Sequence, residues 1–545
     1  MSGKTRVCHG KGSTKEGYVN PEILFRRALL LSNLRPDVSS QSVLSYPVGP
    51  LPVSIFHEDG SLRKTNKAEF ASQLYSMVRK DASFPHFDGP EVFVRDAMGL
   101  VQALYTKNSK TFGDLATTYV QSLLSCVRQF DEVADVYDRY DIEFSIKSTE
   151  RKMRAQRTNC TKIYQVLEIR CLPDWKKFLS VEENKKSLVS FLGNYILKML
   201  PSTEKLPQGK SLYVVGAFDN PETVKVVSND GITECTELES NQEEADTRII
   251  LQIVFADSKF TDSGTRGRIV VQSCDTDVIV LCCHFFGKLC STDELWVFKG
   301  HGHFLPEATK LVPIHEIHEV LTGNVVNVLP VVHALTECDT LSSCYCVGKK
   351  SVFKALIQNE STEIVSGLKN IDDNDAFMNH CRKFVAKLYD VKSKFKDHHD
   401  DLNSLRYKLA TTKESSLARL PPPEVAFIEH VERTRLQAII WLNADKAKAQ
   451  LPVCTEHGWH IDNGNISPIP FRGSMSSDVL NELICKCKGK SKCSGECICH
   501  SRRFPCTELC LCGGGDLCCN TQTHNLGLVY EEQNNESERE DGSLD

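Results

Sequence analysis

Cysteine is concentrated near one end of this 545-residue chain, and this concentration constrains its folding more than any other feature. Ten of the 24 cysteines fall between Cys485 and Cys519, in the pattern C-x-C-x5-C-x3-C-x-C-x6-C-x3-C-x-C-x5-C-C. So few apolar residues lie in this block that bound metal must supply its folding energy. Residues 1–17 contain no apolar segment of the signal-peptide type, so we expect reduced, metal-binding thiols, with disulfides as the alternative.

The number of thiolates limits how zinc can be bound. If one of the final pair is spare, nine thiolates remain, and they can complete three tetrahedral zinc sites only if three sulfurs each bridge two ions. Three Zn²⁺ ions and nine thiolates carry a charge of -3, which six Lys/Arg against three acids in the block offset. The predicted zinc ligands are Cys485, Cys487, Cys493, Cys497, Cys499, Cys506, Cys510, Cys512, Cys518 and Cys519.

This spacing resembles the tesmin-type CXC domain, a zinc cluster that binds DNA. The resemblance implies DNA contacts, for which Lys488, Lys490 and Lys492 are the candidates. The block departs from the family in having five rather than four residues before Cys493, one repeat rather than two, and Glu496 where the family often has Tyr. A zinc-held protein-interaction module is the alternative.

Residues 106–395 carry the pattern of an α/β domain. The β-branched runs SLYVVGAF (residues 211–218) and RIVVQSC (residues 268–274) are typical of buried strands, whereas residues 243–258 and 278–289 are helix-like. This alternation predicts a parallel sheet with helices on both faces. Ligands of such sheets bind at the carboxyl ends of the strands.

Acidic residues occur where these predicted elements begin or end. Asp275 and Asp277 follow RIVVQSC, and their i, i+2 spacing lets both carboxylates face one site. Glu244 and Asp246 open the preceding helix, and Asp138 follows the strand-like VADVY. Each pair of carboxylates at ~4 Å repels by on the order of 1 kcal/mol even in water, and bound Mg²⁺ or Mn²⁺ would remove that cost. Helix caps and solvated loops are the alternative.

Asp114, before LATTYVQSLLS, and Asp339, after VLPVVHAL, extend the acidic set. In chain order, FGDLATTYVQSLLS, VYDRYDIEFSIKSTERKMRAQ, EEADTR, SCDTDVIVL and LTECDTLSSCYCVGKKSVFKAL resemble the motifs of flap-endonuclease/PIN-like nucleases. The resemblance implies two-metal phosphodiester hydrolysis without a covalent intermediate. It gives as metal-binding catalytic candidates Asp114, Asp138, Glu244, Asp246, Asp275, Asp277 and Asp339. Glu337 stands where that family usually has Gly.

Basic residues near these motifs are candidates for nucleic-acid contacts. Lys147, Arg151 and Arg154 recur at helical spacing after Asp138, a plausible phosphate-steering face. Lys349 and Lys350 belong to the segment that resembles the family's duplex-binding hairpin. The alternative for both sets is a solvated helix surface.

The composition is that of a globular protein, with 41% hydrophobic and 25% charged residues. Its net charge of -6 equals that of residues 531–545 alone, so the rest is neutral and would need local basic patches to bind nucleic acid. Its apolar runs are too short to span a bilayer, so we expect an intracellular protein without membrane contact, nuclear if it binds DNA.

The predicted organisation is an α/β, PIN/flap-endonuclease-like sheet domain with a helical region and a small zinc-cluster domain poor in secondary structure. The predicted divisions are an unassigned region (1–105), the α/β domain (106–395), a helical extension (396–450), a linker (451–482), the zinc cluster (483–522) and an acidic tail (523–545). We expect a DNA-binding protein, with RNA as a possible substrate, whose core is a metal-dependent nuclease. The alternatives are an inactive PIN-like scaffold that binds DNA or chromatin through zinc, and a zinc-cluster adaptor for proteins.

Overall fold

The structure is a computed structural model. It describes residues 5–8, 14–17, 22, 24–27, 29, 44–47, 49–78, 84–142, 144–147, 162–203, 206–301, 304, 311–412, 416–462, 464–473, 483–487, 493, 497–507, 510–513 and 518–520.

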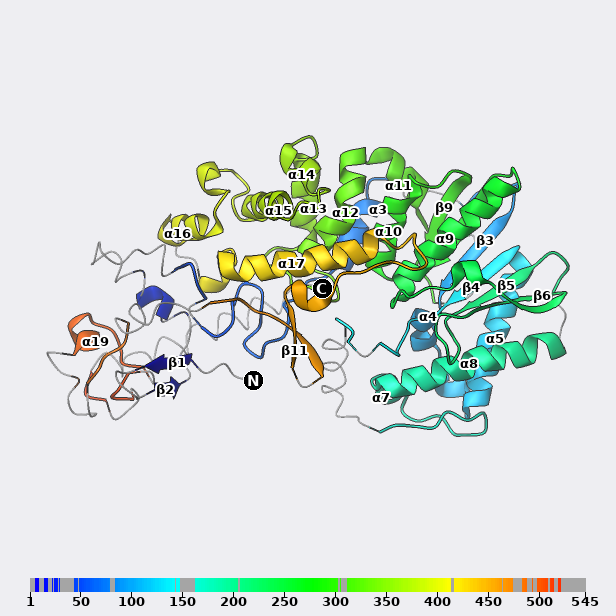
Figure 1. Ribbon diagram of the computed structural model, residues 1–545, viewed down its shortest axis with the longest axis horizontal. Helices are drawn as coiled ribbons and strands as arrows, with labels where there is room; N and C mark the ends of the chain where they lie inside the picture. Colours follow the sequence, from blue (N-terminus) through cyan, green and yellow to red (C-terminus); the bar gives the residue numbers. More distant parts are fainter. Residues whose placement is uncertain are drawn as a thin grey trace.

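An eight-stranded sheet forms the centre of the α/β part (Figure 1). Its strands are β3 (Glu91–Asp96), β4 (Glu132–Val136), β5 (Ser211–Val215), β6 (Val224–Ser228), β7 (Gly231–Glu234), β8 (Gly267–Gln272), β9 (Thr292–Phe298) and β10 (Leu311–Pro313). The order across the sheet is β10-β9-β8-β3-β4-β5-β6-β7. The five strands from β9 to β5 run parallel, and β10, β6 and β7 pair antiparallel at the two edges.

Helices cover both faces of this sheet. One face carries α4 (Ala97–Ala103), α5 (Phe112–Gln129), α7 (Trp175–Leu179) and α8 (Glu182–Thr203), whose core includes Phe93, Val133 and Val270. The other carries α3 (Ala68–Tyr75), α9 (Ala245–Asp262), α10 (Thr276–Phe286), α11 (Ile314–Val320) and α12 (Gly323–Leu335), whose core includes Val94 and Val271. Neighbouring residues of a strand point to opposite faces, so each strand supplies both cores. The predicted α/β fold is confirmed.

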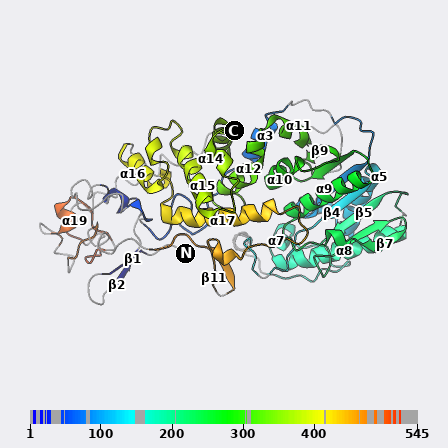
Figure 2. The same ribbon diagram turned by 45° about the horizontal axis from the view of Figure 1, so that its top comes forward.

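Further helices extend the second core. They are α13 (Lys349–Gln358), α14 (Glu363–Gly367), α15 (Asn374–Tyr389), α16 (Leu402–Thr412) and α17 (Glu424–Leu442). Figures 1 and 2 show α17 running from the sheet region toward the end of the molecule that holds α19 (Ile498–Ser501), β1 (Thr5–Cys8) and β2 (Thr14–Gly17). The segment after α17 forms a hairpin of β11 (Trp459–Asp462) and β12 (Asn465–Pro468). Short 3-10 turns are η1 (Thr106–Asn108), η2 (Thr236–Leu238), η3 (Lys396–His398), η4 (Leu417–Arg419) and η5 (Cys454–Glu456).

Two predicted boundaries do not separate structural units. The division after residue 105 excludes β3, although β3 lies between β8 and β4 in the middle of the sheet. The division before residue 396 excludes α17, although α17 packs on α12 and the Trp441 ring stacks on His333 at 5.8 Å. Both segments therefore belong to the body that builds the sheet. Within the described residues, no helix combines the length and hydropathy needed to cross a bilayer.

Candidate functional site

Carboxylates gather at the edge of the sheet where the parallel strands end. Asp96 is the last residue of β3 and caps α4, Asp138 follows β4, and Asp275 follows β8 and caps α10. Asp246 lies in the first turn of α9. These four side chains, with Asp339 after α12, line a cavity of about 570 Å³. The sheet topology thus delivers carboxylates from distant parts of the chain to one cavity.

Two of these carboxylates and the neighbouring Asp277 are close enough to share a metal ion. Asp246, Asp275 and Asp277 each place an oxygen within 4.8 Å of the other two. The backbone N–H of Asp277 donates to Asp275 Oδ1 at 2.9 Å, which fixes the turn between β8 and α10. An all-carboxylate donor set suits Mg²⁺ or Mn²⁺ rather than zinc.

The N-terminus of α9 is built around Asp138. Asp138 Oδ1 accepts the backbone N–H of Ala245 at 2.8 Å, which fixes the start of the helix that carries Asp246. Glu244, the N-cap residue of α9, is 4% exposed. The predicted set of Asp138, Glu244, Asp246, Asp275, Asp277 and Asp339 is therefore brought together in the folded chain.

Two lysines lie among these carboxylates. Lys67 Nζ, just before α3, is 2.9 Å from Asp275 Oδ1, 3.0 Å from Asp339 Oδ1 and 3.5 Å from Asp277 Oδ2. Lys147 Nζ is 2.8 Å from Glu244 Oε2 and 3.8 Å from Asp339 Oδ2. The ammonium groups balance part of the negative charge that the fold concentrates here.

Burial and crowding shift the pKa values of these carboxylates in different directions. Burial, reinforced by the charge of Asp138, raises the pKa of Asp96 to about 7. Burial also raises the pKa of Glu244 to about 7, against the effect of Lys147. Although burial opposes it, Lys147 and Lys67 lower the pKa of Asp339. Asp96 and Glu244 therefore retain part of their protons near neutral pH, whereas Asp339 is ionised. The cavity still carries negative charge that a cation can neutralise.

Asp277 is held by a buried chain of hydrogen bonds. His333 Nε2 lies 2.8 Å from Asp277 Oδ1, and Lys349 Nζ lies 3.1 Å from His333 Nδ1. Burial lowers the pKa of His333 to about 4, so the imidazole is neutral at pH 7, donates from Nε2 to Asp277 and accepts from Lys349 at Nδ1. Lys349 Nζ also donates to the carbonyl oxygens of His333 and Glu337.

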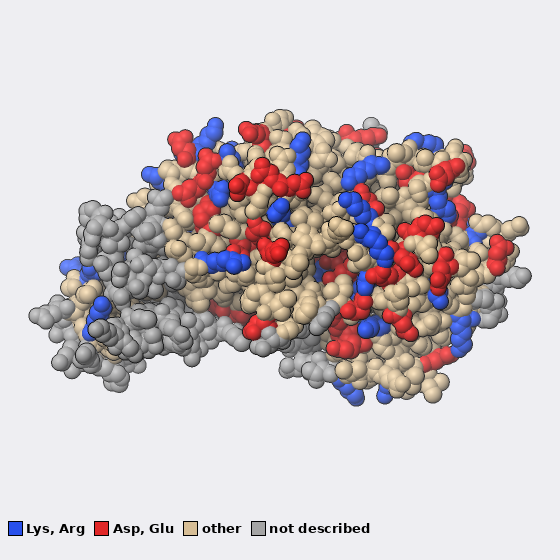
Figure 3. All heavy atoms as spheres, in the orientation of Figure 1, with Lys and Arg blue, Asp and Glu red and all other residues tan. Residues whose placement is uncertain are grey.

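This position of Lys349 contradicts its predicted contact with nucleic acid. Its exposed fraction is 0%, so it cannot reach a phosphate, and instead it satisfies carbonyl groups near the C-terminal end of α12. Lys350, the next residue, is exposed. Arg151, Arg154, Lys488, Lys490 and Lys492 lie outside the described residues. On the face shown in Figure 3, acidic and basic side chains of the described residues are interspersed rather than gathered into one basic surface.

Asp114 was predicted in the acidic set, and the structure places it elsewhere. It is exposed in the first turn of α5, where it forms a capping box with Thr111. Its Oδ2 accepts the backbone N–H groups of Lys110 and Thr111 at 2.9 and 3.0 Å. Asp96, which the sequence reasoning missed, fills the cavity position at the end of the first parallel strand. The signal was available, because EVFVRD is a strand that ends in Asp.

Glu337 has a backbone conformation that is uncommon for a residue with a side chain. Its φ angle is 124°, in the region that favours glycine. Its carboxylate accepts a hydrogen bond from Thr65 Oγ1 and is not among the residues that line the cavity. The residue therefore adds no charge to the lining of the acidic cavity.

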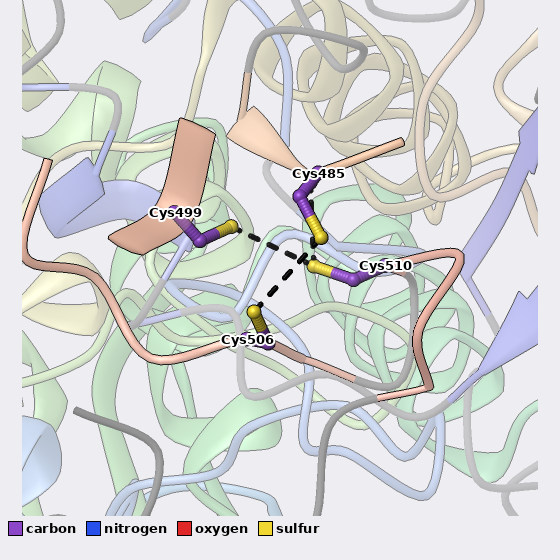
Figure 4. Close-up of side chains that lie close together, drawn as sticks. All are labelled: Cys485, Cys499, Cys506 and Cys510. Carbon is purple, nitrogen blue, oxygen red and sulfur yellow. Dashed lines mark hydrogen bonds between the residues drawn. The ribbon is translucent and has the colours of Figure 1, made fainter. Parts of the chain in front are cut away.

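The ten predicted cysteine ligands form the second candidate site. Eight of them are buried, Cys487 is half-buried and Cys519 is exposed. Three groups of four thiols each have sulfur atoms within 4.8 Å of one another, and Figure 4 shows the first. The groups are Cys485, Cys499, Cys506 and Cys510; Cys485, Cys487, Cys493 and Cys497; and Cys485, Cys493, Cys506 and Cys512.

The sulfur spacing fits tetrahedral zinc. Four Zn–S bonds of about 2.3 Å place neighbouring sulfurs about 3.8 Å apart. The Cys485 sulfur is 3.9 Å from that of Cys506 and 3.7 Å from that of Cys512, and the sulfurs of Cys499 and Cys510 are also 3.7 Å apart. These distances are far longer than a disulfide bond of about 2.05 Å. The cluster is therefore compatible with zinc.

Sharing of sulfurs between sites is visible in the geometry. Cys485, Cys493 and Cys506 each belong to more than one group of four. Cys518 is buried with its sulfur 4.0 Å from that of Cys512, whereas Cys519 is exposed. A nine-thiolate cluster can thus be drawn with Cys518 as the ninth ligand and Cys519 as the spare member of the final pair.

Donors directed at the sulfurs favour thiolates over thiols. The backbone N–H groups of Cys485 and Thr507 donate to Cys510 Sγ at 3.4 and 3.3 Å. The buried side chain of Asn520 donates to Cys506 Sγ at 3.3 Å. Hydrogen bonds donated to the ligand atoms orient metal ligands and stabilise their negative charge.

Comparison with known proteins adds no relative. Neither a scan against protein-family models nor a search of curated proteins finds a match for this chain.

Proposed function

We propose that this protein binds DNA and cleaves phosphodiester bonds with a metal-dependent nuclease core, and that its cysteine cluster is a zinc-held DNA-binding module. The acidic cavity carries the proposal, because Asp246, Asp275 and Asp277 meet at the carboxyl ends of parallel strands within reach of one ion. The resemblance of the acidic motifs to PIN-like nucleases and of the cysteine spacing to the CXC domain supports it.

In this proposal, Asp246, Asp275 and Asp277 hold the divalent ion. Four further carboxyl groups lie around them: Asp96, Asp138, Glu244 and Asp339. A bound Mg²⁺ or Mn²⁺ ion would supply Lewis-acid stabilisation of phosphate charge and an activated water. Asp138 orients Asp246 because it accepts the backbone N–H of Ala245 at the start of α9. His333 orients Asp277 through a hydrogen bond to its carboxylate. Lys147, on the cavity wall, is placed to contact a phosphate oxygen once the substrate is bound.

A second candidate function rests on the two lysines. Lys67 and Lys147 already neutralise part of the charge of the acidic cavity. A chain that uses its own ammonium groups in place of metal ions would be an inactive scaffold that binds DNA or chromatin through the zinc cluster.

Cleavage assays separate these functions. Flap, single-stranded and duplex DNA and RNA are incubated with the full chain and Mg²⁺ or Mn²⁺, beside the Asp275→Ala/Asp277→Ala variant. The matched control is Asp372→Ala/Asp375→Ala, which removes two exposed carboxylates outside the cavity. Cleavage that requires metal and is lost only in the first variant supports the nuclease. DNA binding without cleavage of any substrate refutes it and supports the scaffold.

The DNA-binding part has its own test. The affinity of the full chain for DNA is measured at several salt concentrations, before and after zinc is removed. Affinity that falls with salt and is lost with the zinc supports a zinc-dependent DNA contact. Retention of zinc without any DNA binding supports the protein adaptor instead.

A further inference from the structure

Arg27, from the opposite end of the chain, is buried against the cysteine cluster. Figures 1 and 2 show the N-terminal segment beside α19. The Arg27 side chain belongs to a residue that is 2% exposed, and its NH1 donates to the carbonyl oxygen of Leu483 at 3.0 Å. The same nitrogen lies 3.9 Å from Cys499 Sγ. Its guanidinium lies over the Phe504 ring, 5.3 Å from the centroid.

Neighbouring apolar residues fix this position. Leu24 and Phe25 are each 1% exposed and belong to the same core as Leu483 and Ile484. The segment is therefore packed against the start of the cysteine block rather than resting on its surface.

A buried guanidinium requires a negative partner. Arg remains protonated in proteins, and burying an unpaired charge is costly. Among the described residues, no carboxylate lies within ion-pair distance of Arg27, and its Nε and NH2 atoms are buried without a hydrogen-bond partner. The polar atoms that Arg27 does meet are a carbonyl oxygen and the sulfur of Cys499.

Thiolates that bind zinc would provide the missing charge. Nine thiolates and three Zn²⁺ ions carry -3, and Cys499 belongs to one of the groups of four sulfurs. The described basic residues of the block itself, Lys486, Arg502 and Arg503, are exposed or half-buried, so water screens their charge. Arg27 is the buried cation at this cluster among the described residues.

We propose that Arg27 is an internal counter-ion of the zinc cluster and that the segment around Leu24–Arg27 is a structural part of the zinc-binding unit. This inference rests on the proposed binding of zinc by the cysteines. Arg27 is a positioning residue: it holds the carbonyl of Leu483, two residues before the first ligand, beside the sulfur of Cys499. It thereby ties together two ligand segments that are separated along the block.

Zinc retention tests the proposal in the full chain. The variants are Arg27→Leu, which removes the charge and hydrogen bonds, and Arg27→Lys, which keeps only the charge. Arg26→Leu is the matched control, because Arg26 is adjacent, exposed and paired with Glu22. Zinc content per chain and the rate of zinc transfer to a competing chelator are measured for each protein. Unfolding followed by tryptophan fluorescence checks that the α/β part is intact, since all four tryptophans lie outside the cysteine block.

We expect Arg27→Leu to release zinc about 10- to 100-fold faster than the unchanged chain, the range typical for residues that support metal ligands. Arg27→Lys should fall between them, and Arg26→Leu should match the unchanged chain. Equal release by Arg27→Leu and Arg26→Leu overturns the role of Arg27 while leaving the zinc cluster intact. Absence of zinc from the unchanged chain overturns the zinc cluster and the counter-ion together.

Discussion

Replacement of Lys67 by Met tests whether an ammonium group occupies the place of a metal ion. Lys67 Nζ lies within 3.5 Å of Asp275, Asp277 and Asp339, and its side chain is 25% exposed. Although burial opposes it, the carboxylates of Asp277, Asp275 and Asp339 raise the pKa of Lys67 above its ordinary value, so the group is charged at pH 7.

The size of the effect follows from these contacts. One opposite-charge contact at ~3 Å corresponds to roughly 5 kcal/mol at an effective dielectric constant of 20, before the cost of desolvation. Removing one partner of a buried ion pair typically costs about 3–5 kcal/mol. We take the lower value because part of Lys67 is exposed. Without metal, Lys67→Met should therefore lose about 3 kcal/mol of the free energy of unfolding.

The same interaction opposes metal binding in the unchanged chain. An ion that enters among these carboxylates must first displace the ammonium, and about 3 kcal/mol corresponds to roughly a 100-fold change in affinity. Lys67→Met should thus bind Mn²⁺ about 100-fold more tightly, and saturating Mn²⁺ should restore its lost stability.

Isothermal titration calorimetry with Mn²⁺ and urea unfolding with and without Mn²⁺ measure both effects. Lys350→Met, which removes an exposed positive charge, is the control and should change neither quantity by much. Unchanged Mn²⁺ affinity in Lys67→Met would show that the ammonium does not compete with the ion. Weaker binding would show that Lys67 supports the metal site, and either result refutes the reasoning.

Three further predictions concern stability and metal content. The folded chain keeps a proton on Asp96 up to about pH 7, whereas the unfolded chain loses it near pH 4, so the free energy of unfolding should fall as the pH rises through this window. Asp96→Asn should remove at most about 4 kcal/mol of that fall, as urea unfolding at several pH values would show. His333→Phe should lower the free energy of unfolding by about 3 kcal/mol, because Asp277 loses a buried hydrogen bond; an unchanged urea midpoint would contradict this. Cys485→Ser should lose most of the zinc, because Cys485 belongs to all three groups of four thiols, whereas Cys519→Ser should retain it, as elemental analysis of the purified chain would show.

The sheet could be predicted where a strand contains an uninterrupted apolar run. Every residue of β8 is buried, and its centre is a run of β-branched residues, Ile269 to Val271, that precedes Asp275 and Asp277 in the sequence. The adjacent β3 is as central, but its sequence contains Arg95, which is 1% exposed and lies 3.6 Å from the buried Asp135 of β4. β8 likewise contains a buried arginine, Arg268, which pairs with Glu91 and Glu294. A buried ion pair therefore does not distinguish the two strands, and the apolar run of β3 followed by Asp96 carried the same signal.

Single charged residues were harder to place than strands. Asp114 stands before a helix in the sequence, and both a metal ligand and a capping box favour Asp there. Lys349 and Lys350 are identical neighbours in the sequence, yet one is buried under α12 and the other is exposed. The difference depends on which side of the first turn of α13 packs against the core. The sequence pattern alone does not determine that side.

The cysteine block shows the opposite behaviour. Its ligand spacing is local, so the sharing of sulfurs could be anticipated from a count of thiolates, and the structure shows Cys485, Cys493 and Cys506 in overlapping groups. Its charge balance could not be anticipated in the same way. The basic residues of the block balance its formal charge in the sequence, but the buried cation among the described residues comes from Arg27, hundreds of residues away in the sequence.

Both candidate sites receive charged side chains from the first hundred residues. The acidic cavity receives Lys67 as a cation and Asp96 as a carboxylate, and Lys64 donates to the carbonyl oxygens of Cys338 and Asp339. The cysteine cluster receives Arg27. In both sites, negatively charged ligands from later parts of the chain lie beside a positively charged side chain from the first hundred residues. The ligands of each site therefore depend on that side chain for part of their charge balance. The segment that the sequence left unassigned therefore supplies a cation to each of the two sites, and a fragment that begins after β3 would lack a central strand and both cations.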